Sequence, residues 1–317
     1  MNLPPADRSS MQASVVSVQL SELISLKSMA CRLRYPMPRR AISTLSAKPA
    51  VLHVDSQGLE CIGSRPYQSG DDIRSVDWRQ TARRGALYTK QFTETHERPV
   101  HFLVDMGASM RFATRIAFKS VMAARAASYL VWQIAVSGER VGGQVWTGRA
   151  RLVLNARSLA QGLMPLLQQF ADASAEIPSS FGIDEPLNVV ANKTGMAALI
   201  VVSDFAHMTA ETLRLLQICA RRTHLLMVHV HDPFEVNPPP GIYRLDNGHH
   251  VLTLDLTSGE TRQAYVDQFS RRCAALQQVA RANRASYLPL STDADLSDAL
   301  AGAGNRYIQG RYGNPRA

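Results

Sequence analysis

Two aspartates stand at the ends of apolar runs, where side chains can be presented to a ligand. In the segment PVHFLVDMGASM (99–110) the apolar run ends at Asp105, and the hydroxyl of Ser109 follows closely. A second run, MAALIVVSD (196–204), ends at Asp204. Carboxylate and hydroxyl oxygens are hard ligands that suit a magnesium-like ion. The sequence therefore predicts a ligand site made by these three residues at the ends of two strands.

This predicted site resembles the metal-ion-dependent adhesion site of von Willebrand factor A domains, in which an Asp-x-Ser-x-Ser loop, a threonine and a later aspartate hold a metal. Gly107 replaces the first serine of the loop, and no clear threonine loop precedes Met196. Two interpretations follow. Either Asp105, Ser109 and Asp204 ligate Mg²⁺, or Asp105 and Ser109 only hold the loop and cap the next helix. We favour the second, because three oxygens leave most of an octahedral shell to water.

A dense polar block, GSRPYQSGDDIRSVDWRQTARRGALYTKQF, occupies residues 63–92. Gly70 and the two aspartates after it predict a turn in which a carboxylate bonds nearby backbone. Arginines alternate with aspartates, which favours charge-assisted pairs, and we expect Trp78 to be buried where the block meets the rest of the protein. The residues of this block predicted to bind a partner or hold structure are Arg65, Tyr67, Gly70, Asp71, Asp72, Arg74, Asp77 and Trp78.

Catalysis by the adjacent carboxylates Asp71 and Asp72 is a second interpretation of the block, since neighbouring acids can have their pKa values split. No nucleophile–base pair or glycine-rich phosphate loop accompanies them, so we favour an architectural role. The nine histidines include His229 and His231, which alternate on one strand face, and His249 and His250 beside a turn. A strand pair without a third ligand is more often structural, and we assign no metal to it.

Strands and helices alternate from Val100 onward, and this alternation must position the aspartates. The predicted strands are 100–105, 140–147, 196–204, 224–230 and 286–291, and the predicted helices are 114–136, 158–171, 209–222 and 260–283. The dipeptide Asn247-Gly248 between alternating runs predicts a hairpin over 243–255. This order predicts an α/β fold with a parallel sheet covered on both faces, and ligands then bind at the carboxyl ends of the strands.

Three regions are predicted along the chain. Residues 1–98 form an N-terminal region with an amphipathic helix at 14–34, a strand at 50–54 and the polar block. Residues 99–301 form the sheet domain, with a hairpin insertion near 241–255. Residues 302–317 carry arginines and no acid, and we expect a flexible basic tail.

The composition narrows the class of protein. The 317 residues are 45% hydrophobic, which allows a sizeable core, and no apolar run approaches the length of a membrane span. The first residues lack a basic-then-apolar signal pattern, and the four cysteines are widely separated, so we expect a cytoplasmic protein with reduced thiols. The net charge is +9. Because acids interleave with the basic residues, an acidic protein partner is favoured over nucleic acid, while contact with the inner-membrane surface stays open.

The block RPYQSGDDIRSVDW, followed by VDMGASM, VVSDF and HVHDPFEVNPPPG, closely resembles the family named domain of unknown function 58. Members are von Willebrand A-like proteins commonly encoded beside MoxR-type AAA+ ATPases. The resemblance runs from about Leu20 to Leu300. It implies a von Willebrand A-like, Rossmann-type sheet and an accessory role with such an ATPase in the maturation or metal loading of client proteins.

The sequence thus predicts a non-enzymatic adaptor that binds the ATPase and its clients through the strand-end face around Asp105, with Mg²⁺ as the one cofactor under consideration. Two alternatives remain. One is a metal-dependent hydrolase that uses Asp105 and Asp204, with Asp71 or Asp72. The other is a basic protein that binds nucleic acid or a membrane surface. The client and the oligomeric state are not predicted.

Overall fold

The structure is a computed structural model that describes residues 15–32, 59–68, 71–94, 99–136, 139–148, 151–157, 159–176, 182–246, 251–283 and 285–300. The chain divides into two units. The sheet unit comprises Met1–Pro38 and Arg98–Ala317, and the hairpin unit comprises Arg39–Glu97. Each is described by itself.

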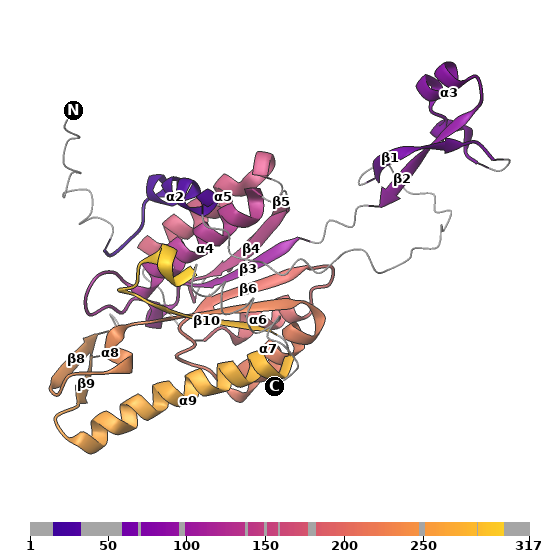
Figure 1. The fold of residues 1–317 in the computed structure, drawn as a ribbon. Coiled ribbons are helices and arrows are strands. Elements are labelled where there is room, and N and C mark those ends of the chain that lie inside the picture. The colour runs from indigo at the N-terminus through magenta and orange to yellow at the C-terminus, as the bar shows by residue number, and fades with distance from the viewer. Residues whose placement is uncertain are drawn as a thin grey trace, which may run out of the picture. The chain divides into compact units, whose positions relative to one another are not determined.

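The sheet unit is built on a six-stranded sheet in the order β10-β7-β6-β3-β4-β5 (Figure 1). The strands are β3 (Val100–Asp105), β4 (Val141–Trp146), β5 (Arg151–Arg157), β6 (Ala198–Ser203), β7 (His224–His231) and β10 (Ser286–Ser291). Neighbouring strands are parallel except at the edge, where β5 runs antiparallel to β4. The chain leaves β3 toward β4 on one side and returns to β6 on the other. The switch point, where such sheets bind ligands, therefore lies between β3 and β6.

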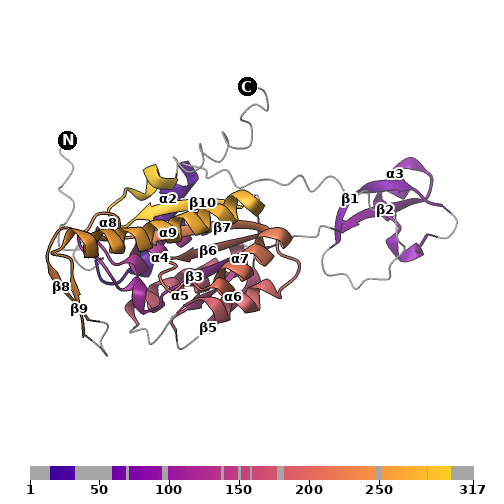
Figure 2. The same ribbon diagram turned by 90° about the horizontal axis from the view of Figure 1, so that it is seen from below.

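Helices cover both faces of the sheet (Figures 1 and 2). Side chains alternate along a strand, so Phe102 and Val104 of β3 enter one apolar core while Leu103 enters the other. The first core is completed by α2 (Leu20–Arg32), α4 (Lys119–Val136) and α5 (Leu159–Ala175), and the second by α6 (Asp184–Ala191), α7 (Ala210–Arg222) and α9 (Gly259–Asn283). The predicted fold class, an α/β fold with a mostly parallel sheet covered by helices, is confirmed.

The N-terminal helix α2 packs in the sheet unit, which differs from the predicted grouping of residues 1–98. Leu23 is fully buried in the core, its carbonyl accepts a hydrogen bond from Trp132 Nε1 at 2.9 Å, and Glu22 forms an ion pair with Arg125 at 2.6 Å. The apolar stripe of α2 lies on α4 because an amphipathic helix is stable only where that stripe is covered.

Three elements of the sheet unit were not predicted. Strand β5 follows β4 closely, and its short apolar run did not stand out. Helix α6 starts at Asp184, within a stretch that gave no clear periodicity. The one-turn helix α8 (Pro233–Val236) lies directly after β7. The predicted hairpin is confirmed as β8 (Ile242–Asp246) paired antiparallel with β9 (Val251–Asp255).

The hairpin unit contains β1 (Leu59–Pro66) and β2 (Tyr88–Glu94), which pair antiparallel. Between them lie η1 (Ile73–Ser75) and α3 (Trp78–Arg84), and α3 ends at Gly85, whose φ of 68° is the left-handed conformation usual after a helix. The predicted strand at 50–54, the turn at 247–250 and the tail at 302–317 lie outside the described residues. In the described part of the chain, no helix has the length and apolar character needed to cross a membrane.

Candidate functional site

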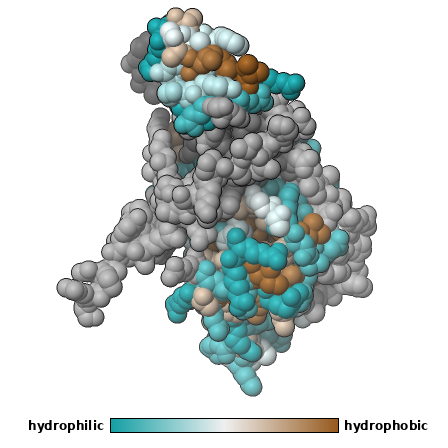
Figure 3. Space-filling model, turned by 90° about the vertical axis from the view of Figure 1, so that its right-hand side faces the viewer, coloured by the Kyte–Doolittle hydropathy of each residue, from teal (hydrophilic) through white to brown (hydrophobic). Residues whose placement is uncertain are grey.

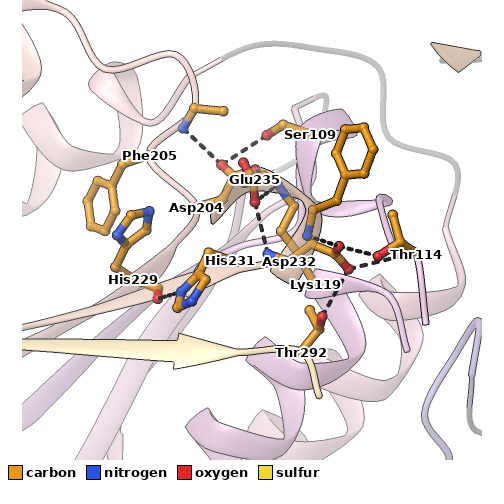
Figure 4. A network of polar contacts seen from close by, with 12 residues as sticks. Ser109, Thr114, Lys119, Asp204, Phe205, His229, His231, Asp232, Glu235 and Thr292 are labelled. Carbon is orange, nitrogen blue, oxygen red and sulfur yellow. Dashed lines mark hydrogen bonds and ion pairs between the residues drawn. The ribbon is translucent and has the colours of Figure 1, made fainter. Parts of the chain in front are cut away.

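The structure brings the three predicted ligand residues together at the switch point. Strand β3 ends at Asp105, and its neighbour β6 ends one residue before Asp204. Ser109, in the short helix η2 (Ala108–Met110), donates its hydroxyl hydrogen to Asp204 Oδ1 at 3.1 Å (Figure 4). A small pocket is lined by all three residues together with His207. The predicted convergence at the strand ends is therefore present.

Asp105 is held by its own loop and by the neighbouring strand. Its Oδ1 accepts the Gly107 N–H at 2.8 Å, and its Oδ2 accepts the Ser203 hydroxyl at 2.6 Å. Burial, reinforced by the negative charge of Asp204, raises the pKa of Asp105 to about 7. The bonds to Gly107 and Ser203 match the loop-holding role that we favoured from the sequence.

Asp204 is committed to internal partners. Its Oδ1 also accepts the Ala206 N–H at 3.0 Å, and its Oδ2 accepts a hydrogen bond from Lys119 Nζ at 2.6 Å. Phe205, the next residue, has a φ of 49°, a strained conformation for a non-glycine residue that turns the chain sharply after β6. Burial is the largest single influence and opposes ionisation of Asp204, but Lys119, the Ala206 N–H and Arg272 together lower the pKa of this carboxyl.

Lys119, the first residue of α4, is the central cation of the site and was not predicted. Its side chain is 3% exposed, and its Nζ also lies 3.4 Å from Glu235 Oε2 (Figure 4). Burial alone would lower the pKa of Lys119, but Asp204 and Glu235 raise it. A lysine among the mostly apolar residues of the predicted helix 114–136 was the available signal in the sequence, although it did not reveal the partners.

Arg272 of α9 completes a four-member network. Its guanidinium lies 3.3 Å from Glu235 Oε1 and donates to the backbone carbonyl of Asp204 at 3.3 Å. Two buried carboxylates, Asp204 and Glu235, are thus matched by two cations. Such matching is required because an unpaired buried charge is far more costly than a paired one.

Asp232, after β7, ties three segments together beside this network. It caps α8, and its carboxylate accepts the Thr114 N–H at 3.0 Å, the Thr292 hydroxyl at 3.0 Å and the Phe234 N–H at 3.0 Å (Figure 4). Burial would raise the pKa of Asp232, but the Thr114 hydroxyl, which also donates to this carboxylate, and the three hydrogen bonds just named lower it. Glu235 in turn accepts the backbone N–H of Asp232 at 2.9 Å, which links the cap to the ion-pair network.

The predicted histidine pair lies on one face of β7, with ring centroids of His229 and His231 5.8 Å apart. His229 Nδ1 hydrogen-bonds to Tyr287 at 2.9 Å, and burial lowers its pKa to about 3, so the ring is neutral. Within the residues that the structure describes, no cluster of three or more His, Cys, Asp or Glu side chains is arranged to hold a metal.

The strand-end residues as arranged do not fit Mg²⁺. Such an ion takes oxygen ligands at about 2.0–2.1 Å, but each oxygen of Asp204 already accepts a hydrogen bond, one of them from an ammonium. A divalent ion on this carboxylate would lie beside the positive charge of Lys119. The interpretation in which Asp105, Ser109 and Asp204 ligate Mg²⁺ stays a prediction, and a metal titration in solution tests it.

The polar block of the hairpin unit holds its own turns, as the architectural interpretation predicts. Arg65 forms a bidentate pair with Asp71 at 2.6 and 2.8 Å, and Asp71 also accepts the Gln68 N–H at 2.9 Å. The Tyr67 hydroxyl donates to the Asp71 carbonyl at 3.1 Å. The pairing of Arg65 lowers the pKa of Asp71, which stays ionised as a structural anion. Gly70 lies outside the described residues.

The other two acids of the block are helix caps. Asp72 accepts the Arg74 N–H at 2.9 Å and begins η1. Asp77 accepts two N–H groups at the start of α3, each at 3.1 Å, together with the Ser64 hydroxyl at 2.6 Å. These bonds give Asp72 and Asp77 a structural task.

Within the hairpin unit 66% of Trp78 is exposed, and its predicted burial where the block meets the rest of the protein stays a prediction. Ile73 and Leu87 are also exposed, at 68% and 48%, and neither η1 nor α3 buries any side chain. Apolar residues gather on the surface of the hairpin unit in Figure 3. Asp77 fixes the start of α3 through its cap, which does not involve the indole of Trp78.

Comparison with known proteins finds a matching family and relatives over most of the chain. Residues 63–275 match the model of the family described as "Protein of unknown function DUF58". Uncharacterized proteins of Mycobacterium bovis and Mycobacterium tuberculosis are 33% identical over 264 residues, which cover 77% of this chain and 80% of theirs.

Two solved structures are also similar. The conserved hypothetical protein BatB from Bacteroides thetaiotaomicron has a TM-score of 0.41 and 16% identity, over 67% of this chain and 99% of its own. The von Willebrand factor type A protein from Catenulispora acidiphila has a TM-score of 0.33 and 10% identity, over 70% of this chain and 44% of its own.

Proposed function

The chain belongs to the DUF58 family, and on that premise we propose that it is a non-enzymatic accessory protein that binds a MoxR-type AAA+ ATPase. The pair acts in the maturation or metal loading of client proteins. The observation that carries the proposal is an exposed surface of the hairpin unit, which we call the α3 surface. It is defined by Ile73 of η1, by Trp78, Arg79 and Arg83 of α3, and by Leu87, which follows α3.

The α3 surface has the composition of a docking site. A seven-residue helix is too short to be stable by itself and usually depends on tertiary burial, yet α3 buries none of its side chains. Aromatic and arginine side chains are also enriched at the energetic centres of protein interfaces. A surface of this kind supports binding of a partner protein.

The charge of α3 selects an acidic partner. The helix carries Arg79, Arg83 and Arg84 and no acid, and Arg74 lies just before it. The nearby aspartates are occupied by the pair and the caps already described. Arg74, Arg79 and Arg83 are exposed, and Arg84 is exposed but lies over the ring of Tyr88. We therefore assign the α3 surface to an acidic patch on the ATPase.

The strand-end network supports the non-enzymatic part of the proposal. Asp204 and Lys119 are 1% and 3% exposed, and each is paired with an opposite charge. A general base or nucleophile must reach its substrate, and these groups are held away from it. Because these acids are buried, we propose that the partner binds at the α3 surface and not at the strand-end face around Asp105.

The test is a binding measurement with the full chain and the MoxR-type ATPase encoded nearest to it. Trp78→Ala and Arg79→Glu should each weaken binding at least tenfold while the thermal melting of the protein stays unchanged. Ile242→Ala, which removes an apolar side chain exposed to 64% on β8, and Arg221→Glu, which reverses an exposed charge on α7, are the matched controls and should bind normally.

Three results would contradict the proposal. If Trp78→Ala lowers the melting temperature and speeds proteolysis between the two units, the α3 surface is covered by the chain itself. Binding to DNA or anionic vesicles that is lost in Arg79→Glu would assign the surface to one of those ligands. Turnover of esters or phosphoesters that disappears in Asp204→Asn would make the protein an enzyme.

A further inference from the structure

We infer that the ammonium of Lys119 is the resident cation of the strand-end site and stands where an adhesion-type site would hold a divalent metal. The inference concerns the sheet unit alone and does not rest on the proposed partner. It predicts that the site is complete without metal.

The geometry around Lys119 is that of a coordinated cation. Its Nζ lies 2.6 Å from Asp204 Oδ2 and 3.4 Å from Glu235 Oε2, and the ring of Phe112 lies 5.6 Å away on another side. An ammonium has three donors and no acceptor, and an aromatic face is a further favourable neighbour for a cation. Carboxylates that follow two different strands, β6 and β7, are thus drawn to one positive centre.

The ammonium also performs the organising task of a metal in this loop. By fixing Oδ2 of Asp204, Lys119 leaves Oδ1 to accept the Ser109 hydroxyl and the Ala206 N–H. The loop after β3 and the turn after β6 are therefore joined through one carboxylate. Ser109 is oriented by Asp204 directly and needs no shared metal.

A divalent ion would have to displace this arrangement. Lys119 and Arg272 already offset the charges of Asp204 and Glu235, and both cations are mostly buried, with 3% and 13% of their side chains exposed. The two positive charges of a divalent ion would be repelled by these cations, because the repulsion between charges is strong at short range in surroundings of low polarity. Lys119 is the first residue of α4, and the first turn of this helix is buried.

A consequence follows for recognition. An adhesion-type metal offers an open coordination position to a partner's carboxylate, whereas a buried ammonium that is satisfied by internal carboxylates offers none. The strand-end face of this protein should therefore not bind acidic groups through a bridging ion.

The experiment is a titration of the full protein with Mn²⁺, a spectroscopic substitute for Mg²⁺, in which electron paramagnetic resonance measures free Mn²⁺. Wild-type protein and the charge-preserving variant Lys119→Arg should bind no stoichiometric Mn²⁺. Lys119→Met removes the ammonium that contacts Asp204 and Glu235, and this variant should bind one Mn²⁺ at least tenfold more tightly than wild type. Adding Asp204→Asn to Lys119→Met should abolish that gain.

Two outcomes would overturn the inference. One is a stoichiometric Mn²⁺ site in wild-type protein that is lost in Asp204→Asn. The other is a folded Lys119→Met protein that gains no affinity. If Lys119→Met folds only when Mn²⁺ is present, the metal has replaced the ammonium and the inference stands. If Lys119→Met folds neither with nor without Mn²⁺, the titration of wild-type protein decides. A wild-type protein without a stoichiometric Mn²⁺ site supports the inference, and a site that is lost in Asp204→Asn overturns it.

Discussion

Replacing Lys119 by methionine should destabilise the sheet unit strongly. The substitution keeps most of the side-chain length and removes the charge that lies 2.6 Å from Asp204 and 3.4 Å from Glu235. Breaking a buried ion pair by removing one partner costs about 3–5 kcal/mol, because the other charge stays buried without compensation. Arg272 still offsets one carboxylate, so we expect the lower half of that range.

The assay is urea unfolding at neutral pH followed by tryptophan fluorescence. Trp132 and Trp146 are 5% and 6% exposed and report on the sheet unit, whereas Trp78 is already exposed and changes little. This separation matters because two units need not unfold in one transition. The matched control is Glu211→Ala, which breaks a pair with Arg214 of the same 2.6 Å length but with side chains 48% and 58% exposed. It should cost under about 1 kcal/mol.

The double variant Lys119→Met with Asp204→Asn tests whether the loss comes from the stranded carboxylate. Residues in one network show coupling of about 0.5–3 kcal/mol, so the double variant should be more stable than the sum of the two single changes implies. If Lys119→Met costs no more than the surface control, or if the two changes are additive, the buried ion pair does not hold the strand ends and our reasoning about the site fails.

Two further predictions follow from the carboxylates. Because burial raises the pKa of Asp105 from 3.8 to about 7, the folded state holds a proton that the unfolded state releases, and stability should fall as pH rises from about 4 to about 7. Asp105→Asn should remove that slope and be more stable than wild type at pH 8, by at most roughly 4 kcal/mol; parallel pH–stability curves would contradict this. Asp77→Ala removes the cap of α3 and should cost about 1–2 kcal/mol, seen as faster limited proteolysis of the hairpin unit. Equal cleavage rates in Asp77→Ala and wild type would show that the cap is dispensable.

The sequence by itself determined the five parallel strands of the sheet and the residues at the strand ends. Buried parallel strands appear as short apolar runs, so β3 and β6 could be located together with the aspartates that follow them, Asp105 and Asp204. The polar block also predicted a turn after Gly70 and charge-assisted pairs within the block. The pair of Arg65 with Asp71 is one of these, and it joins residues only six positions apart.

Only the tertiary structure decided what the strand-end acids contact. Lys119 meets Asp204 across 85 positions of sequence and Glu235 across 116, and Arg272 reaches Glu235 from α9. No periodicity or spacing records such contacts, since they depend on how helices pack on the sheet. For the same reason the sequence grouped α2 with residues 1–98, whereas the helix packs in the core of the sheet unit. Local patterns state which face of an element is apolar, but the partner of a buried charge is set by the fold, which brings distant segments to one point where charges must be matched.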